Sequence, residues 1–172
     1  MIKLLGCIMV IFSTTAIGFI LGEKLKNRTR ELRELQRCIY EIKTRILYSH
    51  TTLPQAIATA STKVKRPVST LFMEVSKMLN KNSVNNVYQA FESVFADNRD
   101  IFNLKDEDIS IILDFSKSLG ESDLEGQKSI FSLTIENLKK QIDMSEVILK
   151  KNIKMYRYLG FSLGAVVVIL LI

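Results

Sequence analysis

Two long segments, one toward each end of the chain, carry apolar residues on a narrow stripe with spacings of three, four and seven positions. This spacing predicts two long α-helices with coiled-coil-like seams. No proline precedes Pro54, so the first helix can continue unbroken from near the N-terminus. The first stripe contains Leu25, Leu32, Leu35, Ile39, Ile42 and Ile46, and the second contains Phe131, Ile135, Leu138, Ile142, Ser145, Leu149, Asn152 and Tyr156.

The two stripes match in register if their helices are antiparallel, which predicts a two-helix stalk. For the distal half of each helix an alternative stays open, in which the stripe faces the rest of a helical bundle. In the stalk the seam pairs Leu32 with Leu149, Ile39 with Ile142, and Ile46 with Ile135. An interleaved layer sets Leu35 against Ser145.

Shorter amphipathic stripes between these segments predict further helices. Thr52 and Gln55 have capping-box spacing, and Pro54 is tolerated in a first helical turn, so a short helix should begin there. Every predicted element is a helix, which makes the fold class all-α. The stripes that follow extend over residues 68–79, 84–95 and about 106–119.

The sequence SLGESDLEGQ, residues 118–127, joins the last of these helices to the second long one. Gly120 fits the left-handed position that ends many helices, and Ser122 with Glu125 forms a capping box for the return helix. Capping leaves the clustering of acids unexplained. We therefore regard this acidic elbow as a candidate partner-binding site, although a purely solvated cap is the simpler alternative. The candidate residues are Gly120, Glu121, Asp123 and Gln127.

Uncharged apolar runs lie at both ends of the chain. Leu4 to Gly22 has 19 residues without a charge, and Tyr158 to Ile172 has 15. A bilayer core needs roughly 20 apolar helical residues, so the first run can span, whereas the second either spans with help from interfacial side chains or lies at the interface. The predicted organisation is a transmembrane helix at 1–22, a helical domain at 23–157 and a second membrane helix at 158–172.

The first apolar run could instead be a site of lipidation or a cleaved signal peptide. LLGC at residues 4–7 resembles a lipobox, but no charged region and apolar run precede it, so lipidation is not expected. A signal peptide cut after Gly18 would have small residues at Ala16 and Gly18. The apolar run continues past that site, which favours an uncleaved anchor.

Basic residues gather beside both apolar runs. Residues 23–45 hold eight Lys or Arg against four acids, and residues 139–157 hold six against two. The positive-inside rule therefore places the central domain in the cytoplasm of a cell membrane. Such a basic collar suits anionic lipid headgroups, and we expect no nucleic-acid partner.

Each apolar run also contains two glycines four residues apart. This spacing lets helices approach closely in lipid, so the glycines are candidates for packing between the two membrane helices. The competing explanation is that glycine is common in membrane helices. The four residues are Gly18, Gly22, Gly160 and Gly164.

Signals for catalysis are nearly absent from the sequence. His50 is the one histidine, and Cys7 and Cys38 form neither a zinc-ligand nor a redox spacing. No phosphate-binding loop or nucleophile elbow occurs. We therefore expect a non-enzymatic binding or scaffolding protein without metal or cofactor.

Three segments in order are similar to the F domain of type II secretion platform proteins. They are TTLPQAI at residues 51–57, SVNNVYQAF at 83–91, and the acidic elbow before a long helix. The F-domain motifs place a Pro-Leu-x-x-Ala-like segment, a second segment ending in Ala, and Gly-Glu at comparable positions. Here only one such unit is present, and Asp123 stands near a position where the motif has serine or glycine.

Short motifs occur along nearly the whole chain. They are a Gly-Phe pair at residues 18–19, YSHTTL at 48–53, RPV at 66–68, LGESDLEGQ at 119–127 and LGFSLG at 159–164, followed by an apolar tail. With these features the chain resembles the stage III sporulation protein AB family of endospore formers.

This resemblance implies a cytoplasmic helical bundle of the F-domain kind, held by two membrane helices. It further implies a platform component of a secretion-like channel in the mother-cell membrane around the forespore, partnered by a cytoplasmic secretion ATPase and other membrane components. A homo-oligomer stays open. On physics alone, a two-span signal transducer with a cytoplasmic output domain is the alternative, although the short outer segments offer little for a receptor to sense with.

Overall fold

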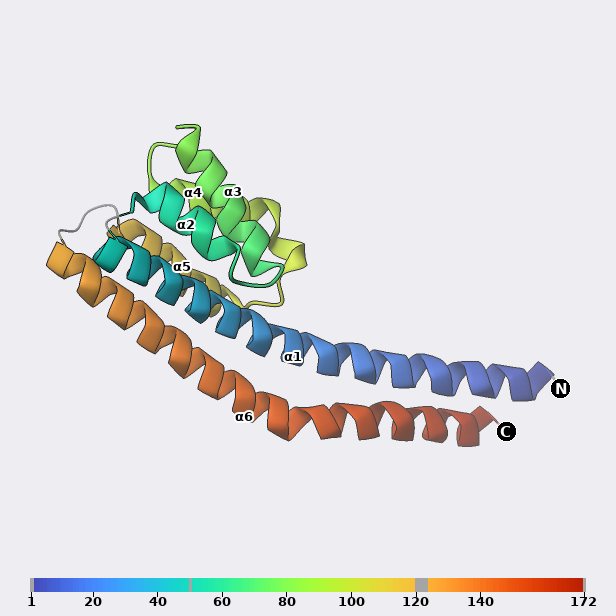
Figure 1. Cartoon of the computed structure of the whole chain (residues 1–172). Coiled ribbons are helices and arrows are strands. Elements are labelled where there is room, and N and C mark those ends of the chain that lie inside the picture. Colours follow the sequence, from blue (N-terminus) through green and yellow to red (C-terminus); the bar gives the residue numbers. More distant parts are fainter. Residues whose placement is uncertain (1, 50, 120–123, 172) are drawn as a thin grey trace. The chain divides into compact units, whose positions relative to one another are not determined.

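The computed structural model describes residues 2–49, 51–119 and 124–171, with fewer side chains described near both ends of the chain. The described residues form helices without any strand, which confirms the all-α fold class (Figure 1). The elements are α1 (Ile2–Ser49), α2 (Leu53–Ser61), α3 (Val68–Asn80), α4 (Val87–Asp97), the 3-10 turn η1 (Arg99–Ile101), α5 (Asp106–Leu119) and α6 (Leu124–Leu171).

The chain divides into two compact units. The bundle unit is Arg30–Asp143, and the two-helix unit combines Met1–Thr29 with Met144–Ile172. Helices α1 and α6 contribute to both units, because each is continuous across the division. The domain limits predicted after residues 22 and 157 rest on the expected membrane boundary and differ from this division, and they stay predictions.

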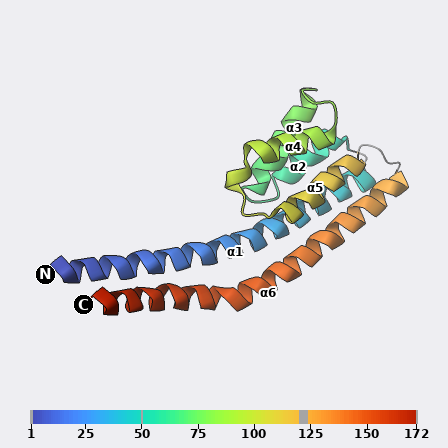
Figure 2. The same ribbon diagram turned by 180° about the vertical axis from the view of Figure 1, so that it is seen from behind.

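Aromatic side chains connect successive helices of the bundle unit. Helices α2 to α5 pack on one another in chain order (Figure 2). Phe72 of α3 meets Phe91 of α4 edge to face, with ring centroids 5.3 Å apart. Phe115 of α5 lies 5.2 Å from Phe131 of α6. Each such pair adds about 0.5–1.5 kcal/mol to the gain from burial alone, so the aromatic residues of the predicted stripes serve as core.

The predicted seam residues of α1 are buried, but in the bundle unit they are not confined to a two-helix seam. Leu32 and Ile39 are fully buried in one core together with side chains from α2 to α5. Ile142 belongs to the same core, and Ile46 and Ile135 pack against it. The alternative in which the distal stripes face a bundle is therefore confirmed. The two-helix arrangement is confined to the other unit, where Leu149 is half-buried.

The predicted pairing of α1 with α6 is wrong by about one heptad. In the two-helix unit the hydroxyls of Thr29 and Ser145 lie 2.6 Å apart. In the bundle unit the Gln36 side chain donates to the backbone oxygen of Ile135 at 3.1 Å, and the Lys43 ammonium donates to the Ser132 hydroxyl at 3.1 Å. These bonds show antiparallel helices, with Ile39 near Ile135 instead of Ile142.

The physical reason for this error is a buried hydroxyl. A seam that repeats every seven residues satisfies its apolar pattern equally well after a shift of one heptad. The predicted register set Leu35 against Ser145, which leaves a buried hydroxyl facing an apolar side chain. In the structure Thr29 donates to the Leu25 backbone oxygen at 3.1 Å, so the Ser145 hydroxyl can donate to Thr29. Pairing two buried hydroxyls avoids a cost of about 1–3 kcal/mol.

The predicted helix starts are confirmed in part. Helix α2 has proline in its first turn, but Thr52 makes no side-chain cap hydrogen bond, so the capping box proposed there is wrong. Helix α4 begins at Val87, later than its stripe suggested, because Asn86 caps it. The Asn86 side chain accepts from the Gln89 backbone N–H at 2.8 Å. The capping residues predicted at Gly120 and Ser122, and His50, lie outside the described residues.

Within the described ranges, no helix contains a stretch long and apolar enough to cross a membrane. The membrane helices at 1–22 and 158–172 remain predictions from the sequence.

Disulfide crosslinking tests the observed register. In a chain with Cys7→Ser and Cys38→Ala, the pair Thr29→Cys and Ser145→Cys should form an intramolecular disulfide, because the parent hydroxyls lie 2.6 Å apart and disulfides need Cβ atoms about 4 Å apart. Ile39→Cys with Ile142→Cys is the matched control, since the observed register separates these positions by about one heptad, roughly 10 Å along the helices. Crosslinking at the control pair alone, measured by non-reducing electrophoresis, would restore the sequence-based register.

Candidate functional site

The acidic elbow falls largely outside the described part of the chain. Gly120, Glu121 and Asp123 lie outside the described residues, whereas Gln127 is half-buried in the first turns of α6. The helix before the elbow ends at Leu119, which is buried in the core. The elbow thus joins two helices of the bundle unit, and its assignment to partner binding stays a prediction.

The structure describes the surroundings of only two of the four candidate glycines in the two-helix unit. Gly18 and Gly22 are buried on α1. Gly160 and Gly164 lie in α6, but their surroundings are outside the described residues. The predicted contact among all four glycines therefore stays a prediction.

A buried carboxylate on α1 forms a polar anchor that sequence reasoning missed. Glu31 is only 2% exposed. One of its oxygens accepts from the Asn103 backbone N–H at 2.9 Å, and the other accepts from the Asn103 side-chain amide at 2.8 Å. The anchor fixes the segment before α5 against α1. It joins residues 72 positions apart, and no local pattern in the sequence marks such a pair.

A second buried carboxylate lies beside this anchor. Asp108 is fully buried and accepts from the Lys105 backbone N–H at 2.9 Å, which caps the start of α5. Burial raises the pKa of the Glu31 carboxyl, the negative charge of Asp108 raises it further, and the Asn103 hydrogen bonds and Arg30 oppose the shift. Hydrogen bonds thus satisfy the buried carboxylates of Glu31 and Asp108, and the pair serves as a structural anchor.

A cavity of about 330 Å³ opens between the start of α3 and the connection from α4 to α5. Its floor includes the buried side chains of Leu71 and Phe102, and Ile101 on η1 is 58% exposed. This volume is at the small end of the range for ligand pockets, about 300–1,000 Å³. We call it the α3–η1 cavity; its full lining is Arg66, Pro67, Thr70, Leu71, Asn98, Ile101 and Phe102.

Hydrogen bonds from neighbouring elements position the walls of this cavity. The Lys65 backbone N–H donates to Glu34 of α1 at 3.0 Å, which holds the α2–α3 loop. On the other wall, the Asn98 side chain donates to Glu74 of α3 at 3.2 Å. Arg66 and Ile101 are therefore presented by segments that are tied to the bundle instead of by free loops.

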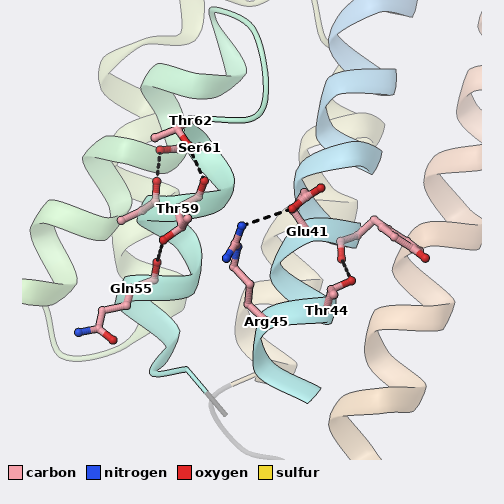
Figure 3. Close-up of polar contacts among 9 residues, drawn as sticks. Glu41, Thr44, Arg45, Gln55, Thr59, Ser61 and Thr62 are labelled. Carbon is pink, nitrogen blue, oxygen red and sulfur yellow. Dashed lines mark hydrogen bonds and ion pairs between the residues drawn. The ribbon is translucent and has the colours of Figure 1, made fainter. Parts of the chain in front are cut away.

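The adjoining faces of α1 and α2 carry local polar contacts (Figure 3). Arg45 extends from α1 toward α2 and approaches Glu41, one turn earlier, at 3.6 Å. At the end of α2, Ser61 and Thr62 donate to the backbone oxygens of Ala58 and Thr59. The Ser61 and Thr62 bonds close the end of α2.

Among the described residues, no group of three or more His, Cys, Asp or Glu side chains could hold a metal ion. Cys38 is fully buried, and burial raises the pKa of its thiol, so that the thiol stays protonated at neutral pH.

The comparisons with known proteins agree with one another. A family model described as stage III sporulation protein AB matches residues 3–172. A protein of that name from Bacillus subtilis (strain 168) is 30% identical over 171 residues, which cover 99% of each chain. A solved structure of a stage III sporulation protein AB superposes with a TM-score of 0.65 at 27% identity, over 71% of this chain and 95% of that one.

Truncating Glu31 should destabilise the bundle unit. Glu31→Ala leaves the two half-buried donors of Asn103 without an acceptor. A fully buried unsatisfied donor costs about 1–3 kcal/mol, so we expect a net loss of about 2 kcal/mol for the pair in urea unfolding of the full-length chain. Glu41→Ala on the same helix is the matched control, since it removes only a partly exposed pair with Arg45 worth about 0.3–0.5 kcal/mol. Equal losses in the two variants would show that the anchor contributes nothing beyond an ordinary surface pair.

Proposed function

This chain belongs to the stage III sporulation protein AB family, and from that premise we propose that it acts as a non-enzymatic platform component of a secretion-like channel complex required for endospore formation. The observation that carries the proposal is the family match over residues 3–172, nearly the full chain. A role in sporulation follows from family membership. The platform role and the partnership with a cytoplasmic secretion ATPase are our inference from the resemblance to F-domain proteins.

The arrangement of the bundle unit supports a scaffolding role. Its core is assembled from all six α-helices, and two buried carboxylates are used to hold segments in place, as Glu31 does for Asn103. Rigid cores of this kind present fixed surfaces to partners. A platform protein requires such surfaces, because its contribution is to position other components rather than to transform a substrate.

Membrane attachment is part of the proposal. The support lies in the two uncharged apolar runs, Leu4–Gly22 and Tyr158–Ile172, and in the basic residues that flank them. The central domain would then face the cytoplasm, in the mother-cell membrane around the forespore. The antiparallel α1 and α6 of the two-helix unit would bring both runs to the same membrane.

Complementation tests the proposed function. Expressed in a Bacillus subtilis strain that lacks its 30% identical relative, this chain should restore heat-resistant spores. Leu35→Asp, which buries a charge at a fully buried core position, should fail at matched expression because the bundle cannot pack around an unpaired charge. Full sporulation without any copy of either protein, or with the Leu35→Asp variant, would refute a required platform role.

Topology reporters test the membrane attachment separately. A reporter that is active only in the cytoplasm should work when inserted near Asn82, an exposed position after α3. It should be inactive when fused after Ile172, because the positive-inside rule holds the basic collar in the cytoplasm. Activity at both positions would remove the second span and leave an interfacial tail.

A further inference from the structure

The α3–η1 cavity combines an apolar floor with a cation at its rim. Leu71 and Phe102 are almost completely buried beneath it. Arg66, on the rim, is exposed. Across the described ranges, no hydrogen bond or ion pair engages its guanidinium. The exposed Lys63 and Lys65 precede it in the same loop but do not line the cavity, so Arg66 is the charged residue of the lining.

These features define the chemistry of an occupant. An apolar side chain would cover the apolar floor, and a carboxylate beside it would meet Arg66. Guanidinium groups bind carboxylates with paired, charge-assisted hydrogen bonds. The fitting ligand is therefore a short acidic segment with an aliphatic residue among its acids.

This chain contains one such segment, the acidic elbow. Its sequence ESDLE, residues 121–125, encloses Leu124 among three acids. We infer that the α3–η1 cavity of one copy binds the acidic elbow of a second copy, with Leu124 over the apolar floor and the elbow carboxylates against Arg66. The inference deepens the proposed function, on which it rests, by naming a partner for the elbow.

The contact joins two different surfaces, so it is heterologous. Each copy has one cavity and one elbow, and a contact of this type continues from copy to copy until rotation closes it into a ring or a filament grows. A paired, two-fold dimer would instead oppose two copies of the same surface. The inference thus predicts assemblies larger than a dimer at high occupancy.

Crosslinking between two differently tagged full-length chains in detergent tests the inference. Both chains carry Cys7→Ser and Cys38→Ala; one adds Thr70→Cys at the cavity, and the other adds Ser122→Cys at the elbow. Because each chain has a single cysteine, a disulfide that joins both tags can only link the cavity of one copy to the elbow of another. Thr59→Cys, exposed on α2 away from the cavity lining, replaces Thr70→Cys in the control.

We expect the cavity cysteine to give at least about tenfold more two-tag dimer than the control, which corresponds to roughly 1.4 kcal/mol of preference. Arg66→Glu in the first chain should remove that excess, as should Glu121→Lys with Asp123→Lys in the second. Combining the two reversed partners should restore it. Matching circular dichroism spectra verify that each variant is folded.

Equal yields for the cavity and control cysteines, or charge reversal without rescue, would overturn the inference. Capture of the cavity cysteine by another protein alone would also overturn it. Spore formation in the complementation assay remains a separate readout: sporulation with no elbow–cavity crosslink would leave the platform role standing and remove only the self-docking.

Discussion

The bundle unit depends on burial of the apolar stripe of α1. Leu32, Leu35, Ile39 and Ile42 are each fully buried, and burying four such side chains is worth about 6–12 kcal/mol. That range is comparable to the whole net stability of a typical domain, about 5–15 kcal/mol. Helices α2 to α5 and the start of α6 share this core, so the short helices, which would be marginal alone, are stable because they cover α1.

Apolar burial does not by itself choose one arrangement, and a few buried polar groups make that choice. The hydroxyl pair of Thr29 and Ser145 selects one of several heptad registers for α1 and α6. The Glu31 carboxylate selects the position of the segment around Asn103, because any displacement would leave two donors and a charge unsatisfied in the core. Stability thus comes mainly from buried apolar area. The choice of one helix arrangement comes from buried polar groups that can be satisfied by only one partner.

The same division explains what the sequence could predict. Helix periodicity and the absence of proline revealed the long α1 and the shorter helices, because these depend on neighbours within a turn or two. The register of α1 with α6 could not be read, since the stripes fit equally well after a heptad shift. The polar anchor could not be predicted either, because Glu31 and Asn103 are 72 positions apart and no local pattern links them.

The α3–η1 cavity was beyond sequence reasoning for a related reason. Its lining comes from the α2–α3 loop, α3, and the connection after α4, so it exists only once the bundle is assembled. The RPV motif around Arg66 was visible in the sequence, but its place at the rim of a cavity was not. Conversely, the acidic elbow was visible from its composition alone, whereas the surface that it would contact could be found only in the fold.

The proposed membrane attachment changes the energetics of the proposed contact between copies. Free association in solution loses translational and rotational freedom at an estimated cost of about 4–15 kcal/mol. Copies anchored through both α1 and α6 share one orientation relative to the membrane and diffuse in two dimensions, so part of that loss has already occurred. The contact through an elbow of three acids and one leucine is small, and this reduced loss strengthens it between neighbouring copies in one membrane. In a common orientation, successive heterologous contacts are related by rotations about the membrane normal, which favours closure into a ring.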